Sequence, residues 1–71
     1  MAESVYKVIQ LVGTSTESFE KAAAAAVMLA SESLRELRIA EIAEFDMTIE
    51  NGAIQSYRAK VNLSFKYEGG S

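Results

Sequence analysis

The chain contains no cysteine, histidine, tryptophan or proline. Without cysteine it can form no disulfide and offers no thiolate to a metal, and without histidine it has no imidazole to bind a metal or act as a catalytic base. The catalytic devices that remain are paired carboxylates, a lysine nucleophile or a serine with an unusual base. The residue spacing indicates none of them, so we do not expect an enzyme or any catalytic residue.

The chain is also short, with 71 residues, and we expect residues 1–71 to form a single domain. A domain of this size buries only about 60% of the surface that its unfolded chain exposes, so its own core is marginal. Disulfides and thiolate metal sites, which often stabilise small domains, are excluded. We therefore expect the chain to gain stability by assembling with copies of itself into a homo-oligomer.

Charge and hydropathy exclude further classes of protein. The 7 basic and 10 acidic residues give a net charge of −3 and a pI of about 4.8, which disfavours nucleic acid as a partner. The longest apolar run, Ala22 to Ala30, is too short to span a membrane, and the hydrophobic content of 49% is typical of a globular protein. The first residues, Met-Ala-Glu-Ser, do not resemble a secretory signal, so we expect a soluble, cytoplasmic protein.

The N-terminal part of the sequence predicts a strand followed by a helix. Val5 to Val12 is rich in β-branched residues and apolar on both alternations, which is typical of a strand covered on two sides. Gly13 to Thr16 has the composition of a turn, and Thr14 with Glu17 three residues later fits a capping box. The free amides of Gly13-Thr14-Ser15 could alternatively bind an anion, although capping is favoured.

The next segment has the periodicity of an amphipathic helix. Apolar residues recur at the i, i+3, i+4, i+7 spacing over five turns: Phe19, Ala22, Ala23, Ala26, Val27, Ala30, Leu34 and Leu37. Because this stripe is mostly alanine, the helix can approach closely whatever it packs on. Met28 lies about 180° from Phe19 on the helical wheel. It is either an isolated exposed apolar side chain or a contact with another subunit.

The C-terminal half predicts a β-hairpin. Arg38 to Ile49 and Gln55 to Tyr67 both alternate, and Asn51-Gly52 between them is a strong turn signal. Apolar residues are mainly odd-numbered in both strands, so odd residues must oppose odd ones and the loop must have an odd length. We therefore predict a three-residue loop, Glu50 to Gly52, with Gly52 in the left-handed conformation. This register places Glu44 opposite Arg58, with Asp46 diagonal to Arg58 and Lys60 diagonal to Glu44.

These elements predict an α+β fold of the order β-α-β-β. A helical crossover makes the first two strands parallel, so placing the third strand between them gives an antiparallel sheet in the order 1-3-2, with the helix on one face. The other face carries polar and charged residues and remains for solvent, a ligand or a neighbour: Glu44, Asp46, Thr48, Ser56, Arg58, Lys60, Asn62, Ser64 and Lys66.

Two features of the second strand concern binding. Glu44 and Asp46 lie on one face of the strand, with their Cα atoms about 7 Å apart. This spacing suits a hard cation such as calcium or magnesium. Alternatively, the two carboxylates pair with Arg58 and Lys60. Glu41 is the one acidic residue in an otherwise apolar row. Its carboxylate requires a donor from its own chain or from a neighbouring subunit.

Three segments of the sequence resemble the dodecin family: VYKVIQLVGTSTESFEKA, LRELRIAEI and SYRAKVNLSFKYE. The similarity runs from Val5 to Glu68. It implies a β-α-β-β protomer whose sheet wraps around the helix, assembled with cubic symmetry into a hollow shell of twelve copies. It also implies a protein that stores or sequesters a small ligand, with riboflavin or FMN as the family ligand, rather than an enzyme.

The resemblance assigns flavin-pocket positions to Ile39, Asp46, Arg58 and Lys66. In flavin-binding dodecins a tryptophan at the position of Ile39 stacks on the flavin, and a glutamine at the position of Arg58 bonds to the edge of the ring. Basic residues for the flavin phosphate match Asp46 and Lys66, of which only Lys66 keeps the charge. These differences imply weaker flavin binding. They leave open a flavin-free shell that binds calcium at Glu44 and Asp46 or has a structural role.

Overall fold

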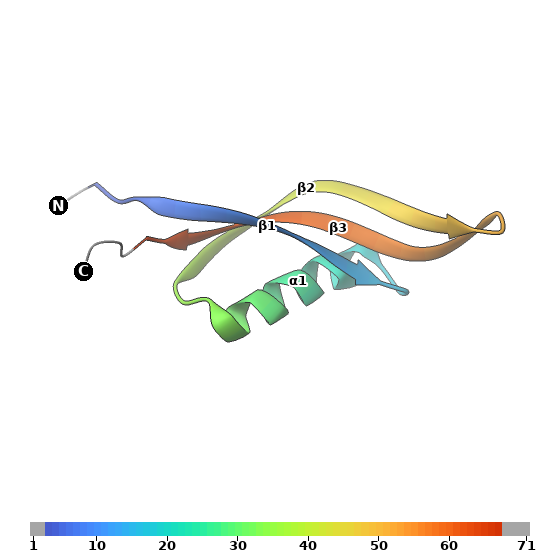
Figure 1. Ribbon diagram of the computed structural model, residues 1–71, viewed down its shortest axis with the longest axis horizontal. Helices are drawn as coiled ribbons and strands as arrows, with labels where there is room; N and C mark the ends of the chain where they lie inside the picture. The colour runs from blue at the N-terminus through green and yellow to red at the C-terminus, as the bar shows by residue number, and fades with distance from the viewer. Residues whose placement is uncertain (1–2, 68–71) are drawn as a thin grey trace.

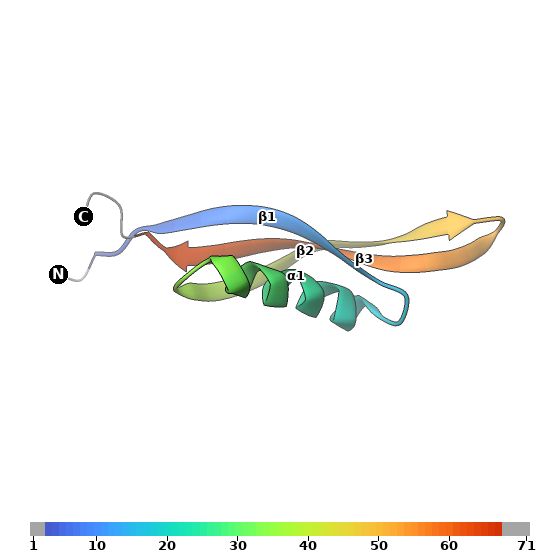
Figure 2. The same ribbon diagram turned by 60° about the horizontal axis from the view of Figure 1, so that its bottom comes forward.

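Three strands and one helix make up residues 3–67, which are the residues that the computed structural model describes. In chain order they are β1 (Tyr6–Ser15), α1 (Phe19–Ser33), β2 (Leu37–Glu50) and β3 (Ala53–Lys66). Both strand pairs are antiparallel and the sheet order is β1-β3-β2, which confirms the predicted topology. The helix lies along one face of the sheet (Figures 1 and 2).

The start of α1 differs from the prediction. Strand β1 remains paired with β3 as far as Ser15, which lies opposite Tyr57, so Thr14 is a strand residue and the predicted capping box with Glu17 is wrong. The N-cap is Ser18 instead, whose side chain accepts a hydrogen bond from the amide of Lys21 at 3.0 Å. The proposed anion site at Gly13-Thr14-Ser15 is wrong for the same reason, because these residues do not begin the helix.

The end of α1 also comes earlier than the periodicity suggested. The helix stops at Ser33, and the amide of Leu34 closes its last turn by donating to the carbonyl of Ala30 at 2.8 Å. Glu36 then adopts a positive φ of 61°, which turns the chain into β2 at Leu37. Leu34 and Leu37 still pack against the core, so their spacing marked the buried face correctly although both lie outside the helix.

The core is a contact between small residues of α1 and the central strand. Ala22, Ala26 and Ala30 are buried against the part of β3 that contains Ala59 to Leu63. Gly13 of β1 is buried against the same helix: a Cβ atom built there would lie 1.9 Å from the carbonyl oxygen of Ala22. Because only glycine permits this approach, β1 and α1 can pack almost backbone to backbone.

The hairpin turn has two residues rather than the predicted three. Glu50 pairs with Ala53, and Asn51 and Gly52 have φ values of 54° and 77°, as a type I′ turn requires. Thr48 lies opposite Ser56 but Ile49 lies opposite Ile54, so Gln55 is bulged out of the ladder. From Thr48 back to Glu44, this bulge gives the pairing of odd with odd residues that the hydrophobic pattern predicted.

The bulge also shifts the register by two residues from the prediction. Asp46 lies opposite Arg58, and Glu44 lies opposite Lys60, whereas Glu44 was predicted to oppose Arg58. A second irregularity leaves Ala43 unpaired, since Ile42 faces Val61 and Glu44 faces Lys60. The faces of β2 therefore exchange at Ala43. This exchange moves Glu41 to the face turned away from α1 and explains why it interrupted the apolar row.

The protomer is elongated and leaves much apolar surface uncovered. Its radius of gyration is 14.8 Å, whereas a compact chain of this length would have about 11 Å. The β2–β3 hairpin extends past the N-terminal end of α1 (Figure 1). Four exposed apolar side chains lie on the helix side of this half of the hairpin: Phe45, Met47, Ile49 and Ile54. Met28 is 66% exposed on the outer face of α1. Surface of this kind usually marks an interface.

Within residues 3–67, no helix combines the length and the apolar character needed to cross a bilayer.

Candidate functional site

The candidate site lies on the sheet face turned away from α1, here called the open face. Ala59, Val61 and Leu63 of β3 point into the core, so the alternate residues of β3 point to the open face. Cross-strand pairing arranges most of this face in five rows: Thr14–Arg58–Asp46, Val12–Lys60–Glu44, Gln10–Asn62–Glu41, Val8–Ser64–Ile39 and Tyr6–Lys66. Thr48 and Ser56 form a further pair on this face, toward the hairpin turn. All of the site residues predicted from the sequence occur in these rows.

The first two rows contain ion pairs. Arg58 donates to Asp46 at two points, from Nε to Oδ1 at 2.7 Å and from Nη2 to Oδ2 at 3.0 Å. The hydrogen bond from Arg58 holds the pKa of the Asp46 carboxyl below its usual value, and the bond to Asp46 raises the pKa of Arg58. In the next row, Lys60 Nζ lies 3.0 Å from Glu44 Oε1. Both carboxylates of the predicted cation site are thus paired with basic side chains.

The third row is a chain of side-chain hydrogen bonds that crosses the whole sheet. Gln10 Nε2 donates to Asn62 Oδ1 at 2.8 Å, and Asn62 Nδ2 donates to Glu41 Oε1 at 3.1 Å. Asn62 is therefore the donor that Glu41 was expected to need. We did not predict this network from the sequence, because the exchange of faces at Ala43 that brings Glu41 opposite Asn62 leaves no simple signal there.

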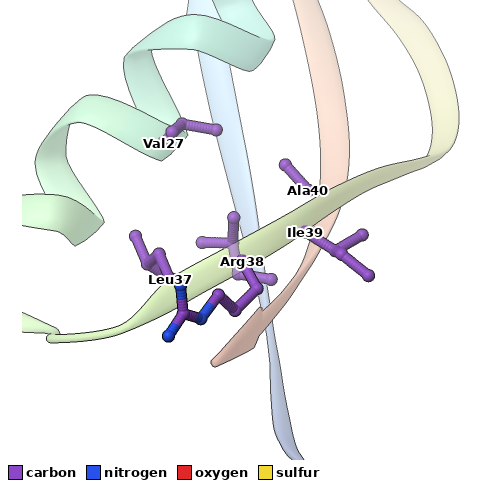
Figure 3. A pocket seen from close by; sticks show the side chains of 6 residues that line it. Val27, Leu37, Arg38, Ile39 and Ala40 are labelled. Carbon is purple, nitrogen blue, oxygen red and sulfur yellow. The ribbon is translucent and has the colours of Figure 1, made fainter. Parts of the chain in front are cut away.

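The remaining predicted residues lie at the other end of the open face. Ile39 lies in the fourth row and is 60% exposed, and Lys66 follows one row later. Ile39 also lines a hollow of about 160 Å³ with Val27 and Leu63. The side chain of Ile39 points away from α1, whereas that of Ala40 points toward α1 (Figure 3). Ligand pockets usually enclose about 300–1,000 Å³, so this hollow is too small to enclose a flavin.

The four predicted flavin-pocket residues form two separate groups. Arg58 with Asp46 is one group, and Ile39 with Lys66 is the other. Ser64, the partner of Ile39, lies six positions after Arg58 on β3, which corresponds to about 20 Å along the strand. One chain therefore does not bring the four residues together around a single ligand.

The predicted cation site has too few free oxygen ligands within one chain. Calcium takes six to eight oxygen ligands, and magnesium takes six. Glu44 and Asp46 supply carboxylates, but Lys60 and Arg58 already bind them. No group of three or more acidic side chains able to hold a metal occurs within residues 3–67. A cation at this place would have to displace basic side chains and take further oxygens from water or another copy.

Comparison with known proteins gives consistent matches. Residues 5–68 match the family model described as Dodecin. Calcium dodecin of Mycobacterium tuberculosis is 46% identical over 63 residues, covering 89% of each chain, and dodecin of Thermus thermophilus is 38% identical over 64 residues, covering 90% of this chain and 93% of the relative. The structure of dodecin from Streptomyces coelicolor superposes with a TM-score of 0.90 at 31% identity, covering 99% of this chain and all of that one.

Proposed function

Because the chain belongs to the dodecin family, we propose that it is a non-catalytic protein that binds and stores a small ligand inside a hollow shell of twelve copies. The single-domain protomer is the repeating unit of this shell. The exposed apolar surface of the hairpin and of α1 supports assembly, because burying it against other copies would supply the stability that so short a chain lacks.

The separation of the two residue groups on the open face is the observation that carries this proposal. Ile39 with Lys66 and Arg58 with Asp46 lie about 20 Å apart in one chain. A pocket that contains all four positions must therefore combine one group from one copy with the other group from a neighbour. Ligand binding and assembly are then one property, and a lone protomer has no complete pocket.

We propose a flavin, riboflavin or FMN, as the ligand, bound more weakly than in tryptophan-containing members. Ile39 offers apolar contact to a ring system but no aromatic face for stacking. Aromatic stacking contributes about 0.5–1.5 kcal/mol beyond the buried area. Its loss on both sides of a ligand held between two copies therefore weakens binding by roughly one or two orders of magnitude.

Riboflavin fluorescence provides the test of this proposal. We expect saturable quenching on titration of the purified assembly, with a dissociation constant at least about tenfold higher than that of Thermus thermophilus dodecin measured beside it. The apolar contact with Ile39 should still support flavin binding, and the lack of a tryptophan ring at this position should weaken it. An absence of quenching at millimolar protein would contradict flavin as the ligand.

Calcium is the second candidate, favoured by the 46% identity to a relative named calcium dodecin. The proposed ligands are Glu44 and Asp46, and magnesium is the alternative ion. Because both carboxylates are held by Lys60 and Arg58, the cation must compete with the chain's own charges, so we expect weak binding.

Calorimetry with calcium and with magnesium tests this second candidate. If Glu44 and Asp46 are ligands, Glu44→Gln with Asp46→Asn should abolish the calcium heat. Glu50→Gln, which removes a carboxylate from the end of β2, should leave it unchanged. Equal heats in the wild type and the double variant would rule out these two residues as the site.

A further inference from the structure

The position of Arg58 on the open face would suit the binding of an anion. It lies on the central strand, and its side chain is partly exposed between Thr14 of β1 and Asp46 of β2. A guanidinium group recognises a carboxylate or phosphate through two parallel N–H groups. Without a partner, Arg58 would therefore offer an anionic ligand a two-point contact.

Asp46 takes up this contact within the chain. Its two carboxylate oxygens accept from Nε and Nη2 of Arg58, which together form one edge of the guanidinium fork. An incoming phosphate would have to replace a carboxylate that is already aligned, and would meet the negative charge of Asp46. Lys60 is likewise engaged by Glu44 in the next row. The positive charges of Arg58 and Lys60 are therefore both balanced by carboxylates of the same chain.

We propose that Asp46 is a specificity-determining residue that keeps Arg58 from binding an anionic ligand, so that the part of the open face around Arg58 and Lys60 selects uncharged ligands. This inference rests on the proposed ligand-binding function, and it names the class of ligand. Among flavins it favours riboflavin over its phosphorylated form. Asp46 acts through Arg58: while its carboxylate accepts hydrogen bonds from the guanidinium group, that group cannot donate them to a ligand.

Inorganic pyrophosphate provides a direct probe of the anion site that does not depend on flavin binding. Titration of the assembled full-length protein by calorimetry at low salt should detect little binding in the wild type. Asp46→Asn should lower the dissociation constant for pyrophosphate at least about tenfold, because it releases a charge-assisted hydrogen-bond donor pair. Asp46→Asn with Arg58→Gln should lose this gain.

Two further variants separate release of Arg58 from a general change of charge. Glu41→Gln removes one negative charge from the open face, but Glu41 accepts a hydrogen bond from Asn62 rather than from a basic side chain, so pyrophosphate affinity should change less than about threefold. Asp46→Glu retains a carboxylate able to pair with Arg58 and should give no gain. Equal gains in Asp46→Asn and Glu41→Gln, or a gain that survives loss of Arg58, would overturn the inference.

The same variants can be titrated with riboflavin and FMN. The ratio of FMN affinity to riboflavin affinity should rise at least about tenfold in Asp46→Asn, and a wild type that prefers FMN would overturn the inference. If neither flavin binds the wild type but Asp46→Asn gains pyrophosphate binding through Arg58, the flavin proposal fails and the inference about anions is supported. The two failures are therefore distinguishable.

Discussion

Gly13→Ala is expected to prevent stable folding and assembly of the protein. The new Cβ atom would lie 1.9 Å from the carbonyl oxygen of Ala22 and 3.2 Å from the Cβ of Ala26. A backbone atom cannot rotate away as a side chain can, so β1 and α1 would have to separate. Overpacking usually costs about 1–3 kcal/mol, and a contact this short with backbone should cost at least the upper value. Thermal unfolding and size-exclusion chromatography would measure the loss.

Gly52→Ala is the matched control for this prediction. Gly52 has a positive φ of 77°, but a Cβ atom there would meet nothing within 4 Å. The substitution should therefore cost only the strain of a left-handed residue, about 1–2 kcal/mol, and leave the assembly intact. If Gly13→Ala unfolded at the wild-type temperature, the close approach of β1 to α1 would not be essential to the fold.

Ile39→Trp combined with Arg58→Gln is expected to raise riboflavin affinity by about 10- to 100-fold. The tryptophan supplies an aromatic face where Ile39 is exposed, and the glutamine supplies an uncharged amide for the edge of the ring. Stacking of about 0.5–1.5 kcal/mol on each side of a ligand held between copies, with one added hydrogen bond, accounts for this range. Fluorescence titration of the purified assembly would measure it.

Ile39→Leu combined with Arg58→Gln is the control for the aromatic ring. It makes the same change at Arg58 and keeps an aliphatic side chain at position 39, so most of the gain should be absent. Unchanged affinity in the tryptophan variant would indicate that neighbouring copies do not bring Ile39 and Arg58 to opposite parts of one pocket. In that case the proposed flavin site would be wrong, although the family assignment would stand.

The local elements of this fold were largely predictable, and the exact pairing was not. Alternation identified both strands of the hairpin, and Asn51-Gly52 identified the turn. The predicted odd-to-odd pairing is correct from Glu44 to Thr48 but wrong beyond Ala43, where Ile42 faces Val61. The loop length was wrong because the same parity results from a two-residue turn followed by a bulge at Gln55. A bulge depends on backbone geometry that the hydrophobic pattern does not encode. The resulting two-residue shift changed which carboxylate faces Arg58.

The candidate site was predictable as a set of residues but not as an arrangement. The charges on Glu44, Asp46, Arg58 and Lys60 indicated cross-strand pairs, and the structure contains two such pairs in a different register. The two-point contact between Asp46 and Arg58 became visible only with side-chain geometry. Completion of the proposed pocket would require neighbouring copies, which the sequence of one chain specifies only through the apolar surface that it leaves exposed.

Self-association is the central claim, since both the stability of the chain and the completion of its pocket depend on it. The most direct test is the mass of the wild-type protein in solution, measured by light scattering. We expect a particle of about twelve chains, each of 7.7 kDa, that retains its circular dichroism only while it remains assembled. A folded, stable particle with the mass of one chain would contradict the account.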